Sequence, residues 1–343
     1  MLVSIVVPFH NGGKAIRNLI YSLLNLSFEN EYEIIFVDDS STDNSSEIVA
    51  NLTKKVSVKC KYIRLENRRG SFYARNRGIE LAEGKIVAFI DADMIPDRNW
   101  LKYLVEPLLD NNVEGVCGKT IPAKEDIIIE AVKVAPSGEE LAYGFGSGNV
   151  AYRRDVLLAV SGFDERFDPK FRGDTDLGCR ILKAGGRIVY EPRAIAYHPI
   201  KEIPLIKLWD YTRGHIHDPL FYKKHKDLIF SSEKIKKTLG STFTQPFIGP
   251  LSLLGLMSIS TLGMLITFAY ISMLFLLYVV ISLIILWVAF FVISGYKFAS
   301  SIPKGRKVEL KLRFKASIHI LLYMLFLLLF RAYGSFKYKQ FFI

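Results

Sequence analysis

The sequence predicts an α/β protein built on a doubly wound, mainly parallel sheet, followed by a hairpin of transmembrane helices. Apolar, β-branched runs alternate with amphipathic helical patterns from residue 2 to residue 198, the order that produces parallel strands joined by right-handed crossovers. Residues 247–294 then contain no Asp, Glu, Lys or Arg. An uncharged stretch of that length is typical of helices that cross a bilayer.

Short apolar runs predict four strands in the first third of the chain, at residues 2–7, 33–37, 58–65 and 86–90. Helical spacing or composition predicts helices around residues 16–24, 48–52 and 70–82. Pro8 should end the first strand and Pro96 the fourth, because proline cannot donate to a ladder. Thr42 or Asp43 is expected to cap the second helix.

The pattern is less regular after residue 96. Residues 113–119 could form a strand, and a glycine-dense turn at 144–149 precedes the apolar run 150–154. A helix should start near Gly173, where acidic residues fill the first turn, and end at Gly185. Residues 187–191 then predict a last strand before a proline.

Two carboxylates leave the carboxyl end of the fourth strand one residue apart. Asp91 and Asp93 follow a run of five apolar residues that reads as a strand buried on both faces. Ligands bind at this rim in open α/β sheets. Carboxylate oxygens suit Mg²⁺ or Mn²⁺, and such an ion suits a diphosphate. By itself the pair is also compatible with two solvated loop acids.

The charge distribution argues against two other classes of function. The 343-residue chain has a net charge of +11, but ten Lys and Arg against one Glu lie after residue 294. This excess flanks apolar segments, so it indicates a membrane surface and not a nucleic-acid partner. The turn at residues 8–13 lacks the G-x-G-x-x-G pattern of dinucleotide-binding enzymes, which argues against hydride transfer.

Several blocks of the first 211 residues, taken in order, resemble glycosyltransferase family 2, which has the GT-A fold. These blocks are residues 6–11, 37–43, 74–78, 89–93, 148–149, 162–165 and 174–177. The resemblance implies a nucleotide-diphosphate-sugar donor and a divalent metal, Mn²⁺ or Mg²⁺, which offsets the charge of the leaving diphosphate.

The resemblance also implies a role for each matching residue. The residues implied in nucleotide-sugar binding are Pro8, Phe9, Asn11, Asp39, Arg75, Asp91, Gly148 and Asn149. Asp93 would bind the metal, and His198 resembles a histidine that approaches the metal in some members. Asp174 would be the general base that takes a proton from the acceptor hydroxyl as that oxygen attacks C1 of the sugar, which inverts the anomeric carbon.

The chain departs from the family pattern at one position. Family members usually have Glu-Asp where this chain has Gly173 and Asp174. Asp176 therefore stays an alternative base, and a non-catalytic, membrane-tethered nucleotide-sugar binder stays an alternative function. His198 could also be a histidine whose hydrogen bonds are satisfied by the protein. His215 and His217 are expected in an interfacial loop and not in a metal site.

The charge pattern predicts how the chain is divided. We expect a catalytic domain at 1–230, a basic linker at 231–246, a two-helix transmembrane hairpin at 247–294, a basic loop at 295–315, and a third apolar helix with a basic tail at 316–343. Basic residues flank the hairpin on both sides, which places the catalytic domain in the cytoplasm at the plasma membrane. The third helix is expected to be re-entrant or interfacial, with a third span as the alternative.

These observations predict an inverting transfer of a single sugar to an acceptor at the cytoplasmic membrane face. The anchor suggests a lipid-linked or glycan acceptor in contact with membrane lipid. Residues 245–249 do not form the Q-x-x-R-W block expected of a processive synthase. A polyprenyl-phosphate sugar synthase is the alternative enzyme, although the chain lacks the Gly-Leu-Gly pattern of dolichol-phosphate mannose synthases.

Overall fold

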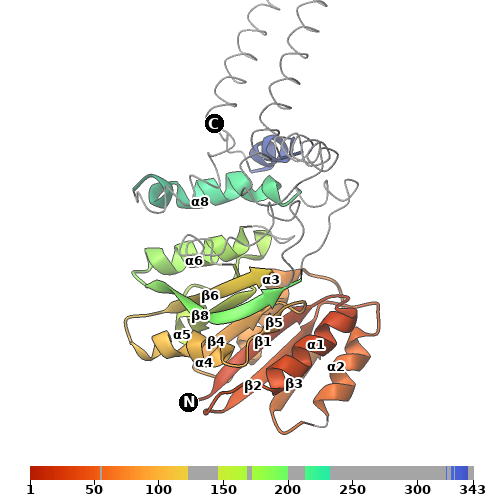
Figure 1. The fold of residues 1–343 in the computed structure, drawn as a ribbon. Helices are drawn as coiled ribbons and strands as arrows, with labels where there is room; N and C mark the ends of the chain where they lie inside the picture. The colour runs from red at the N-terminus through yellow and green to blue at the C-terminus, as the bar shows by residue number, and fades with distance from the viewer. Residues whose placement is uncertain are drawn as a thin grey trace, which may run out of the picture. The chain divides into compact units, whose positions relative to one another are not determined.

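The computed structural model describes residues 1–54, 56–122, 146–167, 172–199, 213–231, 322, 326–327 and 329–338 (Figure 1). The chain divides into two compact units. The first contains Met1–Glu202 and His217–Leu228, and the second contains Ile203–Ile216 and Ile229–Ile343. All the candidate site residues lie in the first unit.

One eight-stranded sheet organises the first unit (Figure 1). Its strands are β1 (Val3–Phe9), β2 (Tyr32–Asp38), β3 (Lys59–Arg64), β4 (Ile86–Ile90), β5 (Ile95–Pro96), β6 (Gly115–Pro122), β7 (Asn149–Arg153) and β8 (Ile188–His198). Their spatial order is β3-β2-β1-β4-β7-β6-β8-β5. Strand β1 pairs in parallel with β2 and β4, and β3 pairs in parallel with β2, as the sequence predicts.

The second half of the sheet is mixed, although most strand pairings of the whole sheet are parallel, as predicted. Strand β7 lies antiparallel to both of its neighbours, β4 and β6, whereas β6 and β8 are parallel. The short strand β5 pairs antiparallel with β8. An apolar run predicts that a strand is buried but not its direction, so the sequence could not reveal the reversal at β7.

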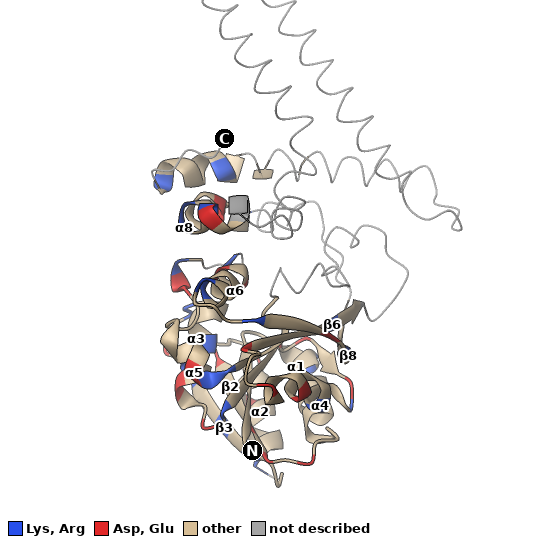
Figure 2. Cartoon of the chain, turned by 90° about the vertical axis from the view of Figure 1, so that its left-hand side faces the viewer, with Lys and Arg blue, Asp and Glu red and all other residues tan. Residues whose placement is uncertain are grey.

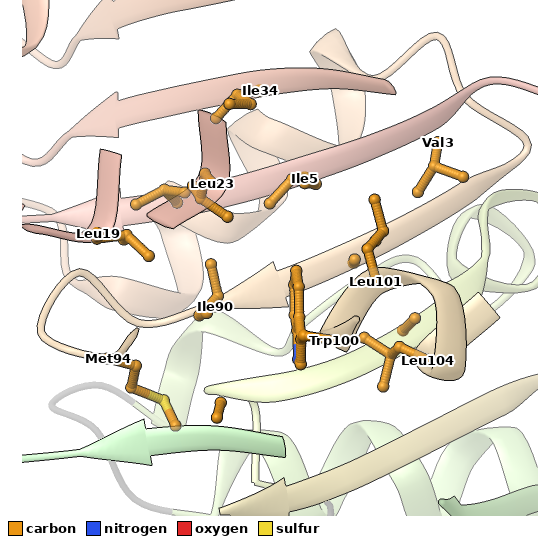
Figure 3. Close-up of a cluster of buried hydrophobic side chains, with 14 of the residues drawn as sticks. Val3, Ile5, Leu19, Leu23, Ile34, Ile90, Met94, Trp100, Leu101 and Leu104 are labelled. Carbon is orange, nitrogen blue, oxygen red and sulfur yellow. The ribbon is translucent and has the colours of Figure 1, made fainter. Parts of the chain in front are cut away.

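Six helices of the first unit cover both faces of this sheet, and a seventh, α8 (Asp218–Ser231), packs on α6; residues 218–228 of α8 belong to this unit (Figure 1). The six are α1 (Gly13–Leu24), α2 (Ser45–Thr53), α3 (Ser71–Leu81), α4 (Trp100–Val105), α5 (Arg154–Ala159) and α6 (Gly173–Lys183). Figure 3 shows Leu19 and Leu23 of α1 with Trp100 of α4 against Ile5 of β1 in one buried cluster. On the other face Gly78 of α3 lies against Val6, where an added Cβ would be 2.3 Å from a methyl carbon.

Two strands continue through prolines that were expected to end them. Pro8 lies inside β1, where the pairing with β4 stops at Val6, so no N–H is needed toward that neighbour. Strand β8 passes Pro192 because its register against β6 jumps at Gly118 and Lys119, and the bulge takes the proline out of the ladder. Helix α2 begins at Ser45, whose N–H donates to Asp43, close to the predicted cap.

The predicted membrane segments are not tested by the described residues. No helix within them is long and apolar enough to span a bilayer. The linker from residue 232, the hairpin at 247–294 and the basic loop at 295–315 lie outside the described residues. Residues 329–337 of the third apolar segment and its tail are helical.

Candidate functional site

The turn after β4 places Asp91 against α3. Arg75 Nη2 donates to Asp91 Oδ1 at 2.5 Å, and the arginine side chain is only 4% exposed. Its guanidinium carbon lies 5.9 Å and 5.8 Å from the ring centres of Phe72 and Phe163. Arg75 is thus held by Phe72 and Phe163, and it fixes the carboxylate of Asp91 at the carboxyl end of β4.

The loop before β7 reaches both Asp91 and the first turn of α6. An added Cβ on Gly148 would lie 2.7 Å from Asp91 Oδ2, so glycine permits the close approach. The neighbouring backbone N–H of Ser147 donates to the carboxylate of Asp174. Two consecutive residues of this loop therefore contact the expected donor carboxylate and the expected base.

The two predicted metal ligands lie together. His198 Nε2 is 3.7 Å from Asp93 Oδ1, because β8 ends at the histidine where it pairs with β5, just after the Asp91–Asp93 turn. His198 Nδ1 lies 2.9 Å from the carbonyl oxygen of Pro199. A carbonyl oxygen can only accept, so Nδ1 is the donor in that bond, and Nε2 is the ring nitrogen that faces Asp93 and is placed to ligate a metal.

This pair fits a divalent metal in part. It offers one carboxylate oxygen and one imidazole nitrogen, and the described residues contain no group of three His, Cys, Asp or Glu that could hold an ion. A metal bound here would need further ligands from the donor diphosphate and from solvent, as is usual for ions that bridge phosphates.

Asp174 occupies the first turn of α6 and is partly exposed. Its Oδ1 accepts the N–H of Thr175 at 2.8 Å. Burial raises the pKa of its carboxyl group, while backbone hydrogen bonds and the charges of Arg75 and Arg172 act in the opposite direction. A carboxylate with a raised pKa is a stronger base, which suits proton abstraction from a hydroxyl.

Gly173, where the family pattern has Glu, lies against an aromatic cluster. An added Cβ would lie 2.4 Å from the ring of Phe72, which stacks on Phe163 at 5.5 Å between ring centres. Phe163 in turn meets Phe89 edge to face. In this chain Phe72 fills the space that a side chain at position 173 would need.

Asp176, the alternative base, is fully buried and engaged by three basic side chains. Its carboxylate lies 2.8 Å from Arg180 Nε, 2.5 Å from Lys224 Nζ and 2.8 Å from His225 Nε2. Burial acts to raise its pKa, but the hydrogen bond to His225 and the charges of Arg180 and Lys224 lower it below its ordinary value. This carboxylate anchors α6 to α8, and the geometry favours Asp174 as the base.

Two residues with implied donor contacts shape the turns after β1 and β2. Asp39 accepts the backbone N–H groups of Arg69 and Gly70 at 2.7 Å and 2.9 Å. Asn11, at a φ of 54°, accepts the N–H of Thr42 at 2.8 Å. Both side chains therefore hold the loops that precede α3 and α2, which is a structural role in addition to any contact with a nucleotide.

Three other residues with implied donor contacts are buried among protein groups. Pro8 and Phe9 are buried in β1, and Phe9 belongs to the core cluster. Asn149 accepts the Trp100 indole N–H at 2.7 Å and donates to two carbonyl oxygens of the β6 and β8 region. Asn149 thus links neighbouring strands to α4. These contacts give the three residues packing roles that the family resemblance did not indicate.

Sequence reasoning missed the residues of α8 that support the site. Lys224 and His225 bind Asp176, and Asp218 binds Arg172, over separations of 46 to 49 residues. No local pattern could connect positions so far apart. His215 and His217, expected in an interfacial loop, are 4% and 2% exposed, and His217 packs against Phe167.

The comparisons with known proteins agree with this arrangement. Residues 4–132 match the family model "Glycosyl transferase family 2". The chain is 33% identical over 117 residues to glycosyltransferase GlyG of Streptococcus pneumoniae, covering 34% of this chain and 38% of that protein. It is 31% identical over 147 residues to TuaG of Bacillus subtilis, named a putative teichuronic acid biosynthesis glycosyltransferase, covering 41% and 55%. The chain thus spans about two fifths to a little over half of these relatives.

A solved structure shows the same fold. The mannosyltransferase PcManGT of Pyrobaculum calidifontis, in complex with GDP-Man and Mn²⁺, aligns with 95% of this chain and 86% of its own, with a TM-score of 0.62 and 17% identity. This likeness supports a GT-A-like α/β fold with a mixed sheet. Residues 4–132 are thus similar in sequence to glycosyltransferase family 2, and the fold is similar to that of this solved structure.

Proposed function

We propose that the chain is an inverting, metal-dependent glycosyltransferase that moves one sugar from a nucleotide-diphosphate donor. The observation that carries this proposal is the proximity of His198, at the end of β8, to Asp93, in the turn that also holds Asp91: His198 Nε2 lies 3.7 Å from Asp93 Oδ1. The loop at Ser147 and Gly148 then links Asp91 to Asp174. Expected donor ligands and an expected base are therefore connected through one short loop.

Each residue of this set has a chemical task. Asp93 and His198 would hold the metal, whose charge offsets the charge of the departing nucleoside diphosphate. Arg75 keeps Asp91 in place for the donor. Asp174 takes the proton of the acceptor hydroxyl while that oxygen forms a bond to C1 of the sugar and the bond from C1 to the diphosphate oxygen breaks. Attack opposite the leaving group inverts the anomeric carbon.

The acceptor and the location belong to the same proposal. From the sequence alone we propose that residues 247–294 cross the membrane as a hairpin with both ends in the cytoplasm, since the segment is uncharged and basic residues flank it. The catalytic domain then faces the cytoplasmic side of the plasma membrane, and a lipid-linked or glycan acceptor would reach it there. A sugar-loading reaction on a polyprenyl phosphate is the alternative within the same site.

A thermal-shift screen of the detergent-solubilised chain tests the site. UDP, GDP, CDP and dTDP are each added with Mn²⁺, with Mg²⁺ and with a chelator; GDP with Mn²⁺ comes first because the similar fold was solved with GDP-Man and Mn²⁺. A ligand that binds the folded state raises the melting temperature by mass action. We expect one nucleotide to stabilise the chain only with metal.

Three variants make this screen specific. Asp93→Ala and His198→Ala should lose the metal-dependent part of the shift, whereas Asp227→Asn, which changes an exposed carboxylate on α8, should keep it. Stabilisation by no nucleotide under any condition would contradict the proposal. Binding without release of nucleoside diphosphate from the matching sugar donor would favour the non-catalytic binder instead.

A further inference from the structure

Helix α8 lies next to α6 (Figures 1 and 2), and ion pairs join the two helices at several positions. Just before α6 begins, Arg172 Nε donates to Asp218 Oδ1 at 2.8 Å, and both side chains are buried. In the first turn, Asp176 meets Lys224 and His225. At the last turn, Lys183 Nζ lies 2.7 Å from Asp227. The start of α6 is therefore fixed by residues of α8.

Arg172 has a backbone conformation that needs such support. Its φ and ψ angles are 71° and −15°, in the left-handed region that non-glycine residues rarely adopt. A residue with this conformation persists where its surroundings hold it. Asp218 supplies a buried ion pair, and the Phe221 ring, 5.6 Å from the guanidinium carbon, supplies a cation–π contact. Both contacts come from the first turn of α8.

Asp174 lies two residues after Arg172, and four titratable or charged groups from several elements interact with it electrostatically. They are Arg75 from α3, Arg172 from the start of α6, Cys117 from β6 and Tyr152 from β7. Burial raises the pKa of the Cys117 thiol to about 12 and that of Tyr152 above its ordinary value. Of these four groups, the two arginines are the ones charged near neutral pH. Arg75 also binds Asp91, and Arg172 also binds Asp218.

We propose that Asp218 and Arg172 are positioning residues for Asp174. Asp218 holds Arg172 in its left-handed conformation, and Arg172 sets both the start of α6 and the positive charge beside the base. The position of α8 thereby governs the geometry of Asp174. This inference rests on the proposed function, in which Asp174 is the general base.

The test compares pH profiles of donor cleavage by the full-length chain in detergent. The readout is release of nucleoside diphosphate from the donor that matches the stabilising nucleotide. We expect Arg172→Gln to move the acidic limb of kcat to higher pH, because loss of the cation makes Asp174 harder to ionise. Asp218→Asn should lower kcat about tenfold with little change in KM, since a misplaced catalytic group costs rate and not donor affinity.

Asp227→Asn is the matched control, because it removes a contact between α6 and α8 that is far from Arg172. It should leave kcat, KM and the pH profile unchanged. Arg172→Lys keeps the charge and should restore the acidic limb. If Asp218→Asn leaves an unpaired buried charge that prevents folding, the double variant Arg172→Gln, Asp218→Asn removes both charges. The inference would be overturned if the folded Arg172 and Asp218 variants had the kcat of the wild type and the same acidic limb of the pH profile.

A second measurement needs no activity. In a double-mutant cycle of Arg172→Gln and Asp174→Asn, the changes in melting temperature at pH 7.5 should be non-additive, because the two side chains interact. Additive changes would overturn the inference. Wild-type protein that releases no nucleoside diphosphate would contradict the proposed function, but the outcome of the cycle would still decide the placement of Arg172.

Discussion

The two sides of the first turn of α6 present the same chemical group to different surroundings. Asp174 is partly exposed, accepts backbone N–H groups, and has a pKa that burial raises. Asp176 is fully buried, meets three basic side chains from α6 and α8, and has a lowered pKa. One side of the helix faces the loop at Ser147, and the other faces α8.

Helical geometry explains the contrast. Successive residues of an α-helix are about 100° apart around its axis, so two residues in positions i and i+2 point to nearly opposite sides. An acidic pair with this spacing cannot share one task on a single face. The sequence leaves both aspartates as candidates for the base, and only the packing of α8 on one side separates them. The same contrast can be tested by changing each side in turn.

The largest expected effect comes from replacing Asp174, on the side of α6 that faces the loop at Ser147. Asp174→Asn should reduce nucleoside-diphosphate release about 10³-fold, in the range expected for loss of a general base, while nucleotide and metal still raise the melting temperature. Asp93→Ala should reduce nucleoside-diphosphate release and should also lose the metal-dependent shift in melting temperature. Loss of that shift in Asp174→Asn would show that Asp174 serves donor binding and not proton transfer.

Replacing Asp176, on the buried side of α6, should reduce the stability of the fold. Asp176→Ala leaves Arg180, Lys224 and His225 without their shared carboxylate, and breaking a buried charge network of this kind costs about 3 kcal/mol. Denaturant unfolding of the detergent-solubilised chain measures the loss. Asp227→Asn, which breaks an exposed pair between the same helices, should change stability by less than about 0.5 kcal/mol. Equal stability of the two variants would contradict the anchoring role of Asp176.

Changing the packing of Gly173 against Phe72 should reduce stability less than removing the carboxylate of Asp176. Gly173→Ala brings a Cβ to 2.4 Å from the Phe72 ring, and overpacking of a filled space costs about 1 to 3 kcal/mol. Phe72→Leu in the same chain should recover part of the loss, because leucine leaves room for the methyl group. Melting temperatures of the single and double variants measure this. A Gly173→Ala chain as stable as wild type would show that the turn has space for a side chain.

The smallest expected effect is a pair of opposite pH dependences. The pKa of Asp176 is lowered, so its contribution to stability is complete above its ordinary value of 3.8 and is lost as the pH falls through the folded value. The pKa of Asp174 is raised, so its ionisation destabilises the fold at neutral pH and costs nothing below 3.8. Asp174→Asn should therefore melt above wild type at pH 7 and converge with it near pH 3.5, whereas Asp176→Asn should melt below wild type at pH 7 and approach it at lower pH.

The positions of Asp91 and Asp93 could be predicted from the sequence, because the apolar run that precedes them is a local signal. Asp91 and Asp93 follow a strand whose apolar run is continuous, and the structure places them directly after β4. His198, proposed on the basis of the family resemblance, lies beside Asp93. The first four strands lie near their predicted positions along the chain, and they pair in parallel as predicted, since alternating strands and helices leave few possible connections.

The remaining features depend on contacts between distant parts of the chain. Pro8 could stay inside β1 because the neighbouring strand β4 stops pairing earlier, which a single strand's sequence does not reveal. Asn149 matches a family block, but its partners are Trp100 and two distant carbonyl groups. The membrane hairpin at 247–294 stays a prediction from composition.

The comparison of Asp174→Asn with Asp176→Asn is the most direct test of the proposed base. The initial rate of nucleoside-diphosphate release is measured for both variants at one pH near 7 and at a temperature where both are folded. We expect Asp174→Asn to lose about 10³-fold in rate and Asp176→Asn to keep most of its rate. A near-normal rate in Asp174→Asn, with the loss found in Asp176→Asn, would contradict the assignment of Asp174 as the base.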